Sequence, residues 1–218
     1  EIYSANEDGS GLQKVSPSAG YDAESTVCGK KIVFSSSRSK DSLQIYTVNT
    51  DGSELKQITK EIGYNGGPFF SPDCKKIVFR SYRPKTEKAK KEFIAADHQG
   101  YIPQSNLELY SIDADGKNER KLTEFEKASF APSYYPDSKK VIFSSNIGSD
   151  PTKGERVFQL WAVSASQREQ KVAEQITFGG TFNGFPMFSP DGRHVVFASN
   201  RNSSNPHELQ VFLAEWKN

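Results

Sequence analysis

The stretch that decides the fold is residues 188–201, which read Phe-Ser-Pro-Asp-Gly-Arg-His-Val-Val-Phe-Ala-Ser-Asn-Arg. It contains a Pro-Asp-Gly sequence, which is typical of a tight turn, followed by a short apolar run. A continuously apolar run of this length is typical of a strand that is buried on both faces. The apolar run occurs four times along the chain, and Pro-Asp precedes three of the four, so this stretch is one copy of an internal repeat.

The other three copies have nearly the same strand. They read Lys-Lys-Ile-Val-Phe-Ser-Ser at 30–36, Lys-Lys-Ile-Val-Phe-Arg-Ser at 75–81 and Lys-Lys-Val-Ile-Phe-Ser-Ser at 139–145. The phenylalanines of the four copies are 45, 64 and 54 residues apart. A four-stranded propeller blade needs about 40–50 residues, so the two longer intervals carry insertions.

A second phrase alternates with the first and supplies the other strands of the unit. It consists of an alternating strand, an Asp-Gly turn and a short polar strand that ends in an aliphatic residue followed by Thr or Ser. Copies run over 2–16, 45–59 and 109–123, a fourth over 160–177 lacks the Asp-Gly, and a fifth begins at Val211. Asp-Gly is a strong hairpin signal, so each unit is predicted to contain four antiparallel strands.

These repeats predict an all-β fold, a single β-propeller domain over 1–218 with about 4.5 four-stranded antiparallel blades. The expected blades are 20–60, 63–124, 127–178 and 182–218, with 1–16 as part of an earlier blade. The last blade lacks its outer strand. Pairing the chain ends to close the ring would leave residues 1–6 over, so we expect the chain to be the C-terminal part of a longer propeller.

The longest insertion, 83–106, is the least repetitive part of the chain. Residues 86–97 are predicted to form a short helix, because Ala89, Phe93 and Ala96 make one apolar stripe and Thr86 is a suitable cap. Gly100 is the expected end signal. The stripe packs on its own propeller in one interpretation; in the other, the insertion is a docking surface or a lid over the channel.

Composition excludes several classes of protein. The chain has 218 residues and a formal net charge of +1, which excludes the strong basic field of a general nucleic-acid binder. The repeated lysine pairs are interpreted as solvated turns, the alternative being a ring for an anionic partner. There is no apolar run of 18 residues, so no membrane insertion is expected. Cys28 and Cys74 fall in turns of different blades and are expected to be unpaired, with a disulfide as the alternative.

No catalytic, metal or cofactor site is predicted. The sequence has no Gly-x-Ser-x-Gly elbow for a hydrolase serine, and its three histidines lack ligand-like spacing. Residues 111–116 superficially suggest a calcium loop. However, Gly116 comes three residues after Asp113, whereas the glycine of an EF-hand loop comes five residues after its first Asp. The glycine pairs at 66–67 and 179–180 precede strands rather than helices, which excludes a dinucleotide-binding fingerprint.

The candidate binding residues surround the channel, because propellers commonly bind ligands there. Aligning the innermost strands superposes four polar residues, which we expect to form a ring that offers hydrogen bonds: Asp22, Asn65, Ser129 and Asn183. Their aromatic neighbours either anchor a partner or pack between blades: Tyr21, Tyr64, Phe130 and Phe182. Three arginines follow the apolar strands and either bridge blades or bind carboxylates: Arg38, Arg83 and Arg201.

Residues 188–201 and 63–73 resemble the WD-like repeat of TolB-type propellers, and 211–216 resembles the C-terminal strand of such proteins. The resemblance covers nearly the whole chain. It implies a six-bladed, exported, non-enzymatic protein that is periplasmic or secreted and serves as a scaffold for a protein or peptide partner. The sequence has no counterpart of the additional N-terminal domain of TolB itself, which departs from the Tol–Pal pattern.

A second resemblance supports an alternative. Prolyl oligopeptidase-type enzymes carry similar repeats beside an α/β-hydrolase domain. The chain would then be the substrate-gating or carbohydrate-binding propeller of a peptidase or polysaccharide-processing enzyme, and the catalytic part would lie outside this chain. Fold resemblance alone does not choose between these functions.

Overall fold

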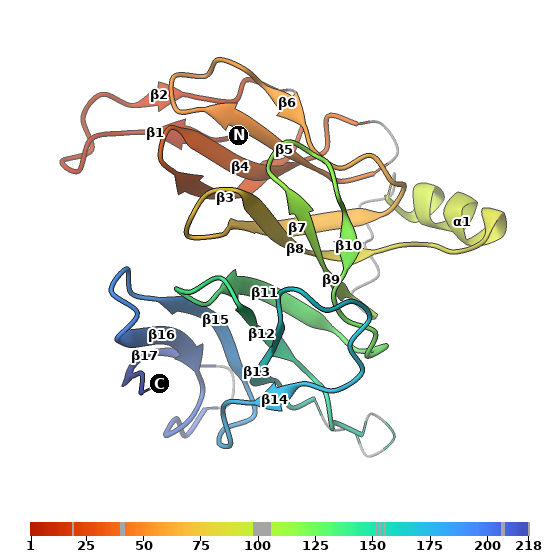
Figure 1. Cartoon of the computed structure of the whole chain (residues 1–218), viewed down its shortest axis with the longest axis vertical. Helices are drawn as coiled ribbons and strands as arrows, with labels where there is room; N and C mark the ends of the chain where they lie inside the picture. The colour runs from red at the N-terminus through yellow and green to blue at the C-terminus, as the bar shows by residue number, and fades with distance from the viewer. Residues whose placement is uncertain are drawn as a thin grey trace.

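The computed structural model describes residues 1–18, 20–39, 42–97, 106–150, 152, 154, 156–205 and 208–217. Successive groups of strands form antiparallel sheets that follow one another along the chain, and one helix projects from the side of the described part (Figure 1). The predicted all-β propeller with four-stranded antiparallel blades is confirmed.

Each sheet is built from strands that are consecutive in sequence, and we number the four larger sheets blades 1 to 4. Blade 1 contains β3 (Asp22–Cys28), β4 (Lys31–Ser36), β5 (Gln44–Asn49) and β6 (Lys56–Gln57). Blade 2 contains β7 (Tyr64–Phe70), β8 (Lys76–Tyr82), β9 (Glu108–Asp113) and β10 (Arg120–Lys121). Blade 3 contains β11 (Ser129–Tyr134), β12 (Lys140–Ser145), β13 (Gln159–Ser164) and β14 (Glu174–Gln175). Blade 4 contains β15 (Asn183–Phe188), β16 (His194–Ser199) and β17 (Gln210–Glu215).

Two further strands, β1 (Tyr3–Ser4) and β2 (Gln13–Lys14), pair with each other as an N-terminal hairpin. Its apolar residues Ile2 and Val15 pack against blade 1 together with Ile32 and Phe34. The hairpin therefore takes the place that the outer strands of a preceding blade would occupy.

The core lies between neighbouring blades. Phe34, Phe79 and Phe143, the repeated phenylalanines of the second strands, are fully buried. Between blades 1 and 2, for example, Val33 and Ile45 pack against Phe70 of the next blade. Burial of one such side chain contributes about 1.5–3 kcal/mol. The apolar repeat is thus the surface that holds each blade to the next.

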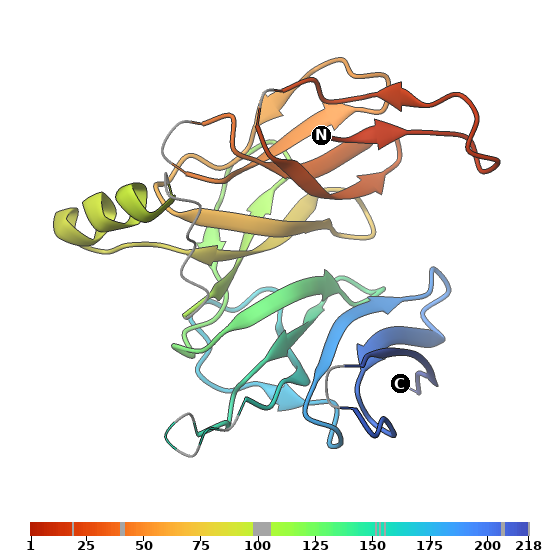
Figure 2. The ribbon, with the colours of Figure 1, turned by 180° about the vertical axis from the view of Figure 1, so that it is seen from behind.

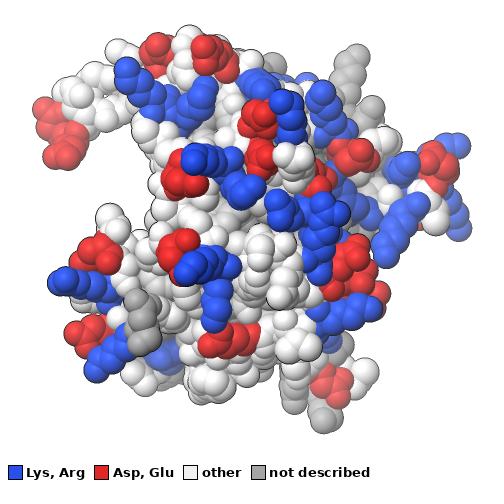
Figure 3. Space-filling model, viewed as in Figure 1, with Lys and Arg blue, Asp and Glu red and all other residues white. Residues whose placement is uncertain are grey.

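The blades form an open arc. Each blade contacts its neighbours in sequence, and in the described residues no contact joins the N-terminal hairpin to blade 4. Figures 1 and 2 show β1–β2 and β17 at the two ends of this arc, on the same side of the molecule. The space-filling view shows the hollow between them (Figure 3).

The repeated lysines are paired with carboxylates of their own blade. Lys31 contacts Glu54, Lys76 contacts Asp113 and Lys140 contacts Glu174 at 3.2, 2.6 and 2.6 Å. These exposed pairs contribute about 0–1 kcal/mol each. In Figure 3 acidic side chains are interspersed among the basic ones. The ion pairs fit the interpretation of these lysines as solvated turns.

The expectation that the two cysteines are unpaired is wrong. Cys28 and Cys74 form a disulfide, with Cα atoms 5.7 Å apart. The error came from treating different blades as distant, whereas the end of β3 and the turn after β7 lie side by side at the blade 1–blade 2 interface. Cys74 has φ of 60°, and the corresponding residue of the 188–201 repeat is Gly192, with φ of 70°.

The predicted helix is confirmed as α1 (Glu87–Asp97). The Ala89 N–H donates to Thr86 Oγ1 at 3.1 Å, so Thr86 caps the helix as expected. Phe93 is buried against Leu43, Tyr64 and Leu107, which anchors the stripe on blades 1 and 2. The expected end signal at residue 100 lies outside the described residues. In the described part of the chain, no helix is long and apolar enough to cross a membrane.

Candidate functional site

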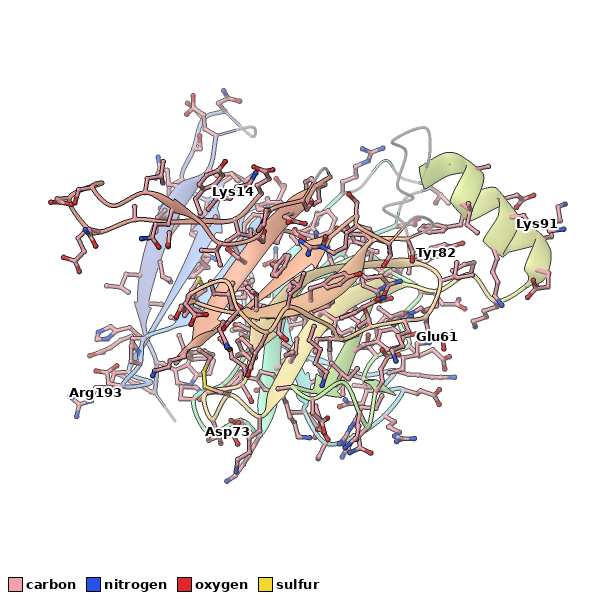
Figure 4. All side chains as sticks on the ribbon, turned by 90° about the horizontal axis from the view of Figure 1, so that it is seen from above. Lys14, Glu61, Asp73, Tyr82, Lys91 and Arg193 are labelled. Carbon is pink, nitrogen blue, oxygen red and sulfur yellow. A yellow bond between two sulfur atoms is a disulfide. The ribbon has the colours of Figure 1, made fainter. Side chains whose placement is uncertain are left out.

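The channel has two ends with different chemistry. Figure 4 shows Asp73 and Arg193, in turns between first and second strands, far from Tyr82 and from Lys91 on α1. We call the end with Asp73 and Arg193 the turn end, and the end with Tyr82 and Lys91 the loop end. The predicted site residues belong to the loop end, because they lie at the starts of the first strands and after the second strands of the blades.

The four ring residues occupy equivalent positions. Each pairs with the last serine of the next strand: Asp22 with Ser36, Asn65 with Ser81, Ser129 with Ser145 and Asn183 with Ser199. All four are at most 3% exposed, so they lie within the wall rather than on its surface.

The side-chain amides of the two asparagines donate hydrogen bonds to the preceding blade. Asn65 Nδ2 donates to the Leu43 carbonyl at 3.0 Å and to Gln44 Oε1 at 3.3 Å. Asn183 Nδ2 donates to Gln159 Oε1 at 2.9 Å. A buried amide that loses such partners costs about 1–3 kcal/mol. Asn65 and Asn183 therefore join blades 2 and 4 to the blades before them, whereas the Ser129 hydroxyl donates to Ser145 of its own blade. The predicted contact of the ring with a ligand stays a prediction.

The three arginines also have partners within the protein. Arg38 donates to Asp22 at 2.7 Å, and Arg201 donates to the Asn183 side chain at 2.8 Å. Arg83 instead contacts Glu119 at 3.1 Å, and the Asn65 oxygen accepts from Ser81. Each guanidinium lies over an aromatic ring of the third strand, 5.0–5.4 Å from its centroid: Tyr46, Tyr110 and Phe212.

Burial raises the pKa of the Glu119 carboxyl, and the Arg83 guanidinium opposes that shift. Burial also raises the pKa of Tyr110 to about 12, so the ring beneath Arg83 stays neutral at physiological pH. The partner of each arginine lies in the arginine's own blade, so these contacts do not bridge neighbouring blades, and two of the three arginines bind carboxylates of the protein itself.

The aromatic residues divide into two groups. In blades 3 and 4, Phe130 and Phe182 have centroids 6.3 Å apart and share contacts with Phe158 and Phe185. We call these four residues the phenylalanine cluster. In blades 1 and 2, Tyr21 is 53% exposed, whereas Tyr64 is buried.

Phe185 was not predicted from the sequence as a site residue, and the backbone displays it in an unusual way. Each first strand contains a bulge, and the residue at its centre has a left-handed φ of 49–57°: Glu24, Gly67, Ala131 and Phe185. A bulky residue rarely adopts this conformation, which costs about 1–3 kcal/mol. Phe185 does so and is 56% exposed.

Glu24 and Arg80 were also missed. Arg80 donates to Glu24 and to the Tyr64 hydroxyl at 2.5 Å, and Glu24 accepts from the Gly67 N–H at 2.8 Å. A Cβ on Gly67 would lie 2.2 Å from Arg80 Nη1, so a larger residue at this position would force the guanidinium away from its present place beside Glu24. The signal was available in the sequence, because Arg80 replaces the serine of two other copies and pairs with Gly66.

A cavity of about 610 Å³ lies toward the turn end. The later halves of all four first strands line it, mostly with apolar side chains that include Val27, Phe69, Tyr134 and Met187. Among the described residues, no group of three potential metal ligands comes together. The histidines at 98 and 207 lie outside the described residues.

Comparison with known proteins identifies the fold. No protein-family model matches the sequence. The crystal structure of TolB from Acinetobacter baumannii superposes with a TM-score of 0.74 at 23% identity, covering 98% of this chain and 45% of that one. The chain has a TolB-like β-propeller fold. A TolB homolog from Chlorobium chlorochromatii is 26% identical in an alignment of 126 positions that covers 43% of this chain and 29% of that protein.

The TolB-like fold is also shared by peptidase propellers. A prolyl endopeptidase structure superposes with a TM-score of 0.60 at 13% identity, covering 90% of this chain and 28% of that one. The chain spans less than a third of the curated relatives that it matches. At these identities the structures show the fold, and the site has to indicate the function.

Proposed function

We propose that the chain is a non-enzymatic, exported scaffold that binds an extended segment of a protein or peptide partner at the loop end of the channel. The observation that carries the proposal is the phenylalanine cluster. Exposed aromatic residues are the usual anchors of protein interfaces. Phe185 is kept half-exposed in a conformation that costs stability, which is typical of a functional position.

The residues on the other side of the loop end complement the cluster. The exposed Tyr21 lies near the Glu24–Arg80 ion pair, since both charges act on the Tyr21 hydroxyl. A segment that places an apolar side chain on the cluster would thus meet hydroxyl and charged groups at blades 1 and 2. The nearly balanced net charge of +1 and the paired lysines favour a protein rather than a nucleic acid.

The disulfide supports export. Disulfides persist in oxidising compartments such as the periplasm and are rare in the cytosol. Cys28 and Cys74 are paired, which agrees with the periplasmic or secreted location that the TolB resemblance implies. Fractionation of cells that express the full gene tests this point. Recovery of reduced protein from the cytosol would contradict it.

Substitution of Phe185 tests the site. Peptides selected on the wild-type protein from an extended-peptide library are expected to bind Phe185→Gly at least tenfold more weakly. Stability should change by less than about 1 kcal/mol, because relief of the left-handed strain offsets the loss of two ring contacts. The matched control is Phe178→Gly, which removes a ring that is 79% exposed and outside the cluster. Equal binding to wild type and Phe185→Gly would refute the proposed site.

The likeness to prolyl endopeptidase propellers favours one alternative: the chain gates or binds substrate for a catalytic part outside it. The two functions differ in the full-length gene. A hydrolase domain encoded beside these repeats would support the alternative, and further blades with an export signal would support the scaffold.

A further inference from the structure

The disulfide between blades 1 and 2 forms part of the wall of a surface pocket. Cys28 and Cys74 both line a pocket of about 870 Å³ at the turn end. Phe70 and Ala114 supply apolar parts of the same wall. Figure 4 shows the sulfur–sulfur bond close to Asp73. Neither cysteine is fully buried, so a small molecule that enters the pocket meets the disulfide.

Lysines outnumber acidic residues on the wall of this pocket. Its charged residues are three lysines and two acidic residues: Lys30, Lys31, Lys56, Glu54 and Asp115. Lys31 is paired with Glu54 at 3.2 Å. Lys56 Nζ instead donates to the backbone carbonyl of Asp115 at 2.8 Å, while the Asp115 carboxylate contacts Lys117. The positive charge of Lys56 is therefore not neutralised by the acidic residues of the pocket.

Lys30 is a second lysine of the pocket without a carboxylate partner. It is exposed, and in the described part of the chain no ion pair joins it to another residue. Hydrogen bonds from Ser53 lower the pKa of Asp51, and the charge of Lys30 adds to that shift from farther away. Asp73, next to the second cysteine in sequence, has the amine of Lys75 at 4.0 Å. The charge around the disulfide is therefore positive on balance.

We propose that the Cys28–Cys74 bond is a site of thiol–disulfide exchange that favours small thiols bearing a carboxylate. The carboxylate would lie among the lysines, and the thiolate of the same molecule would attack Cys74 Sγ. A new sulfur–sulfur bond forms as the Cys28–Cys74 bond breaks. The incoming sulfur is oxidised, and the Cys28 sulfur is reduced and leaves as a thiolate. The site is separate from the phenylalanine cluster and does not depend on the proposed function.

The surroundings of Cys28 suit it as the leaving group. Nearby positive charge favours the thiolate form of a cysteine. Cys28 Sγ lies 3.9 Å from the Ser71 carbonyl oxygen, which can accept a hydrogen bond once the sulfur has taken a proton from water. The product carries the small thiol on Cys74, and blades 1 and 2 are no longer joined by a covalent link.

The test compares three small thiols of different charge on the oxidised chain: mercaptopropionate, mercaptoethanol and aminoethanethiol. Each rate is taken per thiolate and divided by the rate with a neutral model disulfide, which removes differences in intrinsic reactivity. We expect mercaptopropionate to react about 2- to 5-fold faster than mercaptoethanol, the effect of one or two unit charges several ångströms away in water. Aminoethanethiol should react more slowly than mercaptoethanol, and added salt should reduce both differences.

Charge reversal of one lysine tests its role in the preference. Lys30→Glu should remove most of the preference for mercaptopropionate. The matched control is Lys139→Glu, which changes the equivalent lysine of blade 3, a side chain that is 83% exposed and outside the pocket. The control should keep the preference. Mass spectrometry of acid-quenched samples should find the mixed disulfide on Cys74.

Four results would overturn the proposal. The three thiols could show equal relative rates, or the disulfide could react only after urea has unfolded the chain. The preference could be unchanged in Lys30→Glu, or the adduct could be found on Cys28 alone. The first two results need only the wild-type protein, so the proposal can be refuted even if a variant fails to fold.

Discussion

Replacing Cys28 and Cys74 by serine tests how much the covalent link between blades 1 and 2 contributes to stability. The two residues are 46 positions apart in sequence. Closing a loop of that length in the unfolded chain lowers its conformational entropy by an amount worth about 4 kcal/mol at 25 °C. The double variant is therefore expected to lose about 4 kcal/mol of unfolding free energy relative to the oxidised protein.

The left-handed conformation of Cys74 gives an internal control. Its φ is 60°, a conformation that costs a residue with a side chain about 1–2 kcal/mol. The variant Cys28→Ser with Cys74→Gly should thus be more stable than the double serine variant by about 1 kcal/mol. Glycine occupies the equivalent position 192, where φ is 70°.

Urea unfolding followed by circular dichroism measures these differences, with reduced wild-type protein as a further comparison. Hydrogen exchange should report the largest loss of protection at the blade 1–blade 2 interface, in strands β3 and β7. A loss below about 1 kcal/mol would refute the loop-entropy reasoning. So would a double serine variant that equals the Cys28→Ser, Cys74→Gly variant.

Three further predictions concern the channel wall and the turns. Asn183→Ala should lower the unfolding free energy by about 1–3 kcal/mol, because it removes one hydrogen bond to the buried Gln159 side chain and one from Arg201. Urea unfolding measures this loss, and a neutral effect would contradict the blade-joining role. Gly67→Ala should lower the free energy of unfolding by at least about 1 kcal/mol, because the new Cβ would collide with Arg80 and the residue has a left-handed φ of 57°. The control is Gly29→Ala, which has a φ of 58° and no neighbour within 4 Å and therefore shares only the backbone strain. Hydrogen bonds from the hydroxyls of Ser71 and Ser189 lower the pKa values of Asp73 and Asp191 from the usual 3.8. The ionised carboxylates therefore stabilise the fold above about pH 4, and this stabilisation is lost as the pH falls through the lowered pKa values. Acid titration of Asp73→Asn and Asp191→Asn should show a weaker dependence on pH in that range, and an unchanged dependence would contradict this assignment.

The fold could be predicted from the sequence because every blade repeats the same local signals. The apolar strand that contains Phe34 and its equivalents has to be buried on both faces, and the Asp-Gly turns fix how neighbouring strands pair. The helix was predictable for the same reason, since Thr86 and Phe93 act within one short segment. A strand, turn or helix of this kind can be predicted because the residues that determine it are close together in the sequence.

The disulfide and the channel surface depend on contacts between blades, which no local pattern encodes. The register of Asp22, Asn65, Ser129 and Asn183 followed from alignment of the repeats, but their burial did not. It depends on partners such as Gln44 in the preceding blade. The cluster around Phe185 was hidden because a phenylalanine in a bulge looks like any other strand residue in sequence.

The restriction of contacts to adjacent blades has a consequence for the way the molecule comes apart. In repeat proteins the stability of each unit is the sum of its own term and its interfaces. The interface between blades 1 and 2 has the covalent link in addition to its packing, whereas the interfaces between blades 2 and 3 and between blades 3 and 4 have packing and hydrogen bonds but no disulfide. We therefore expect the blade 1–blade 2 interface to open last of these three when the propeller unfolds.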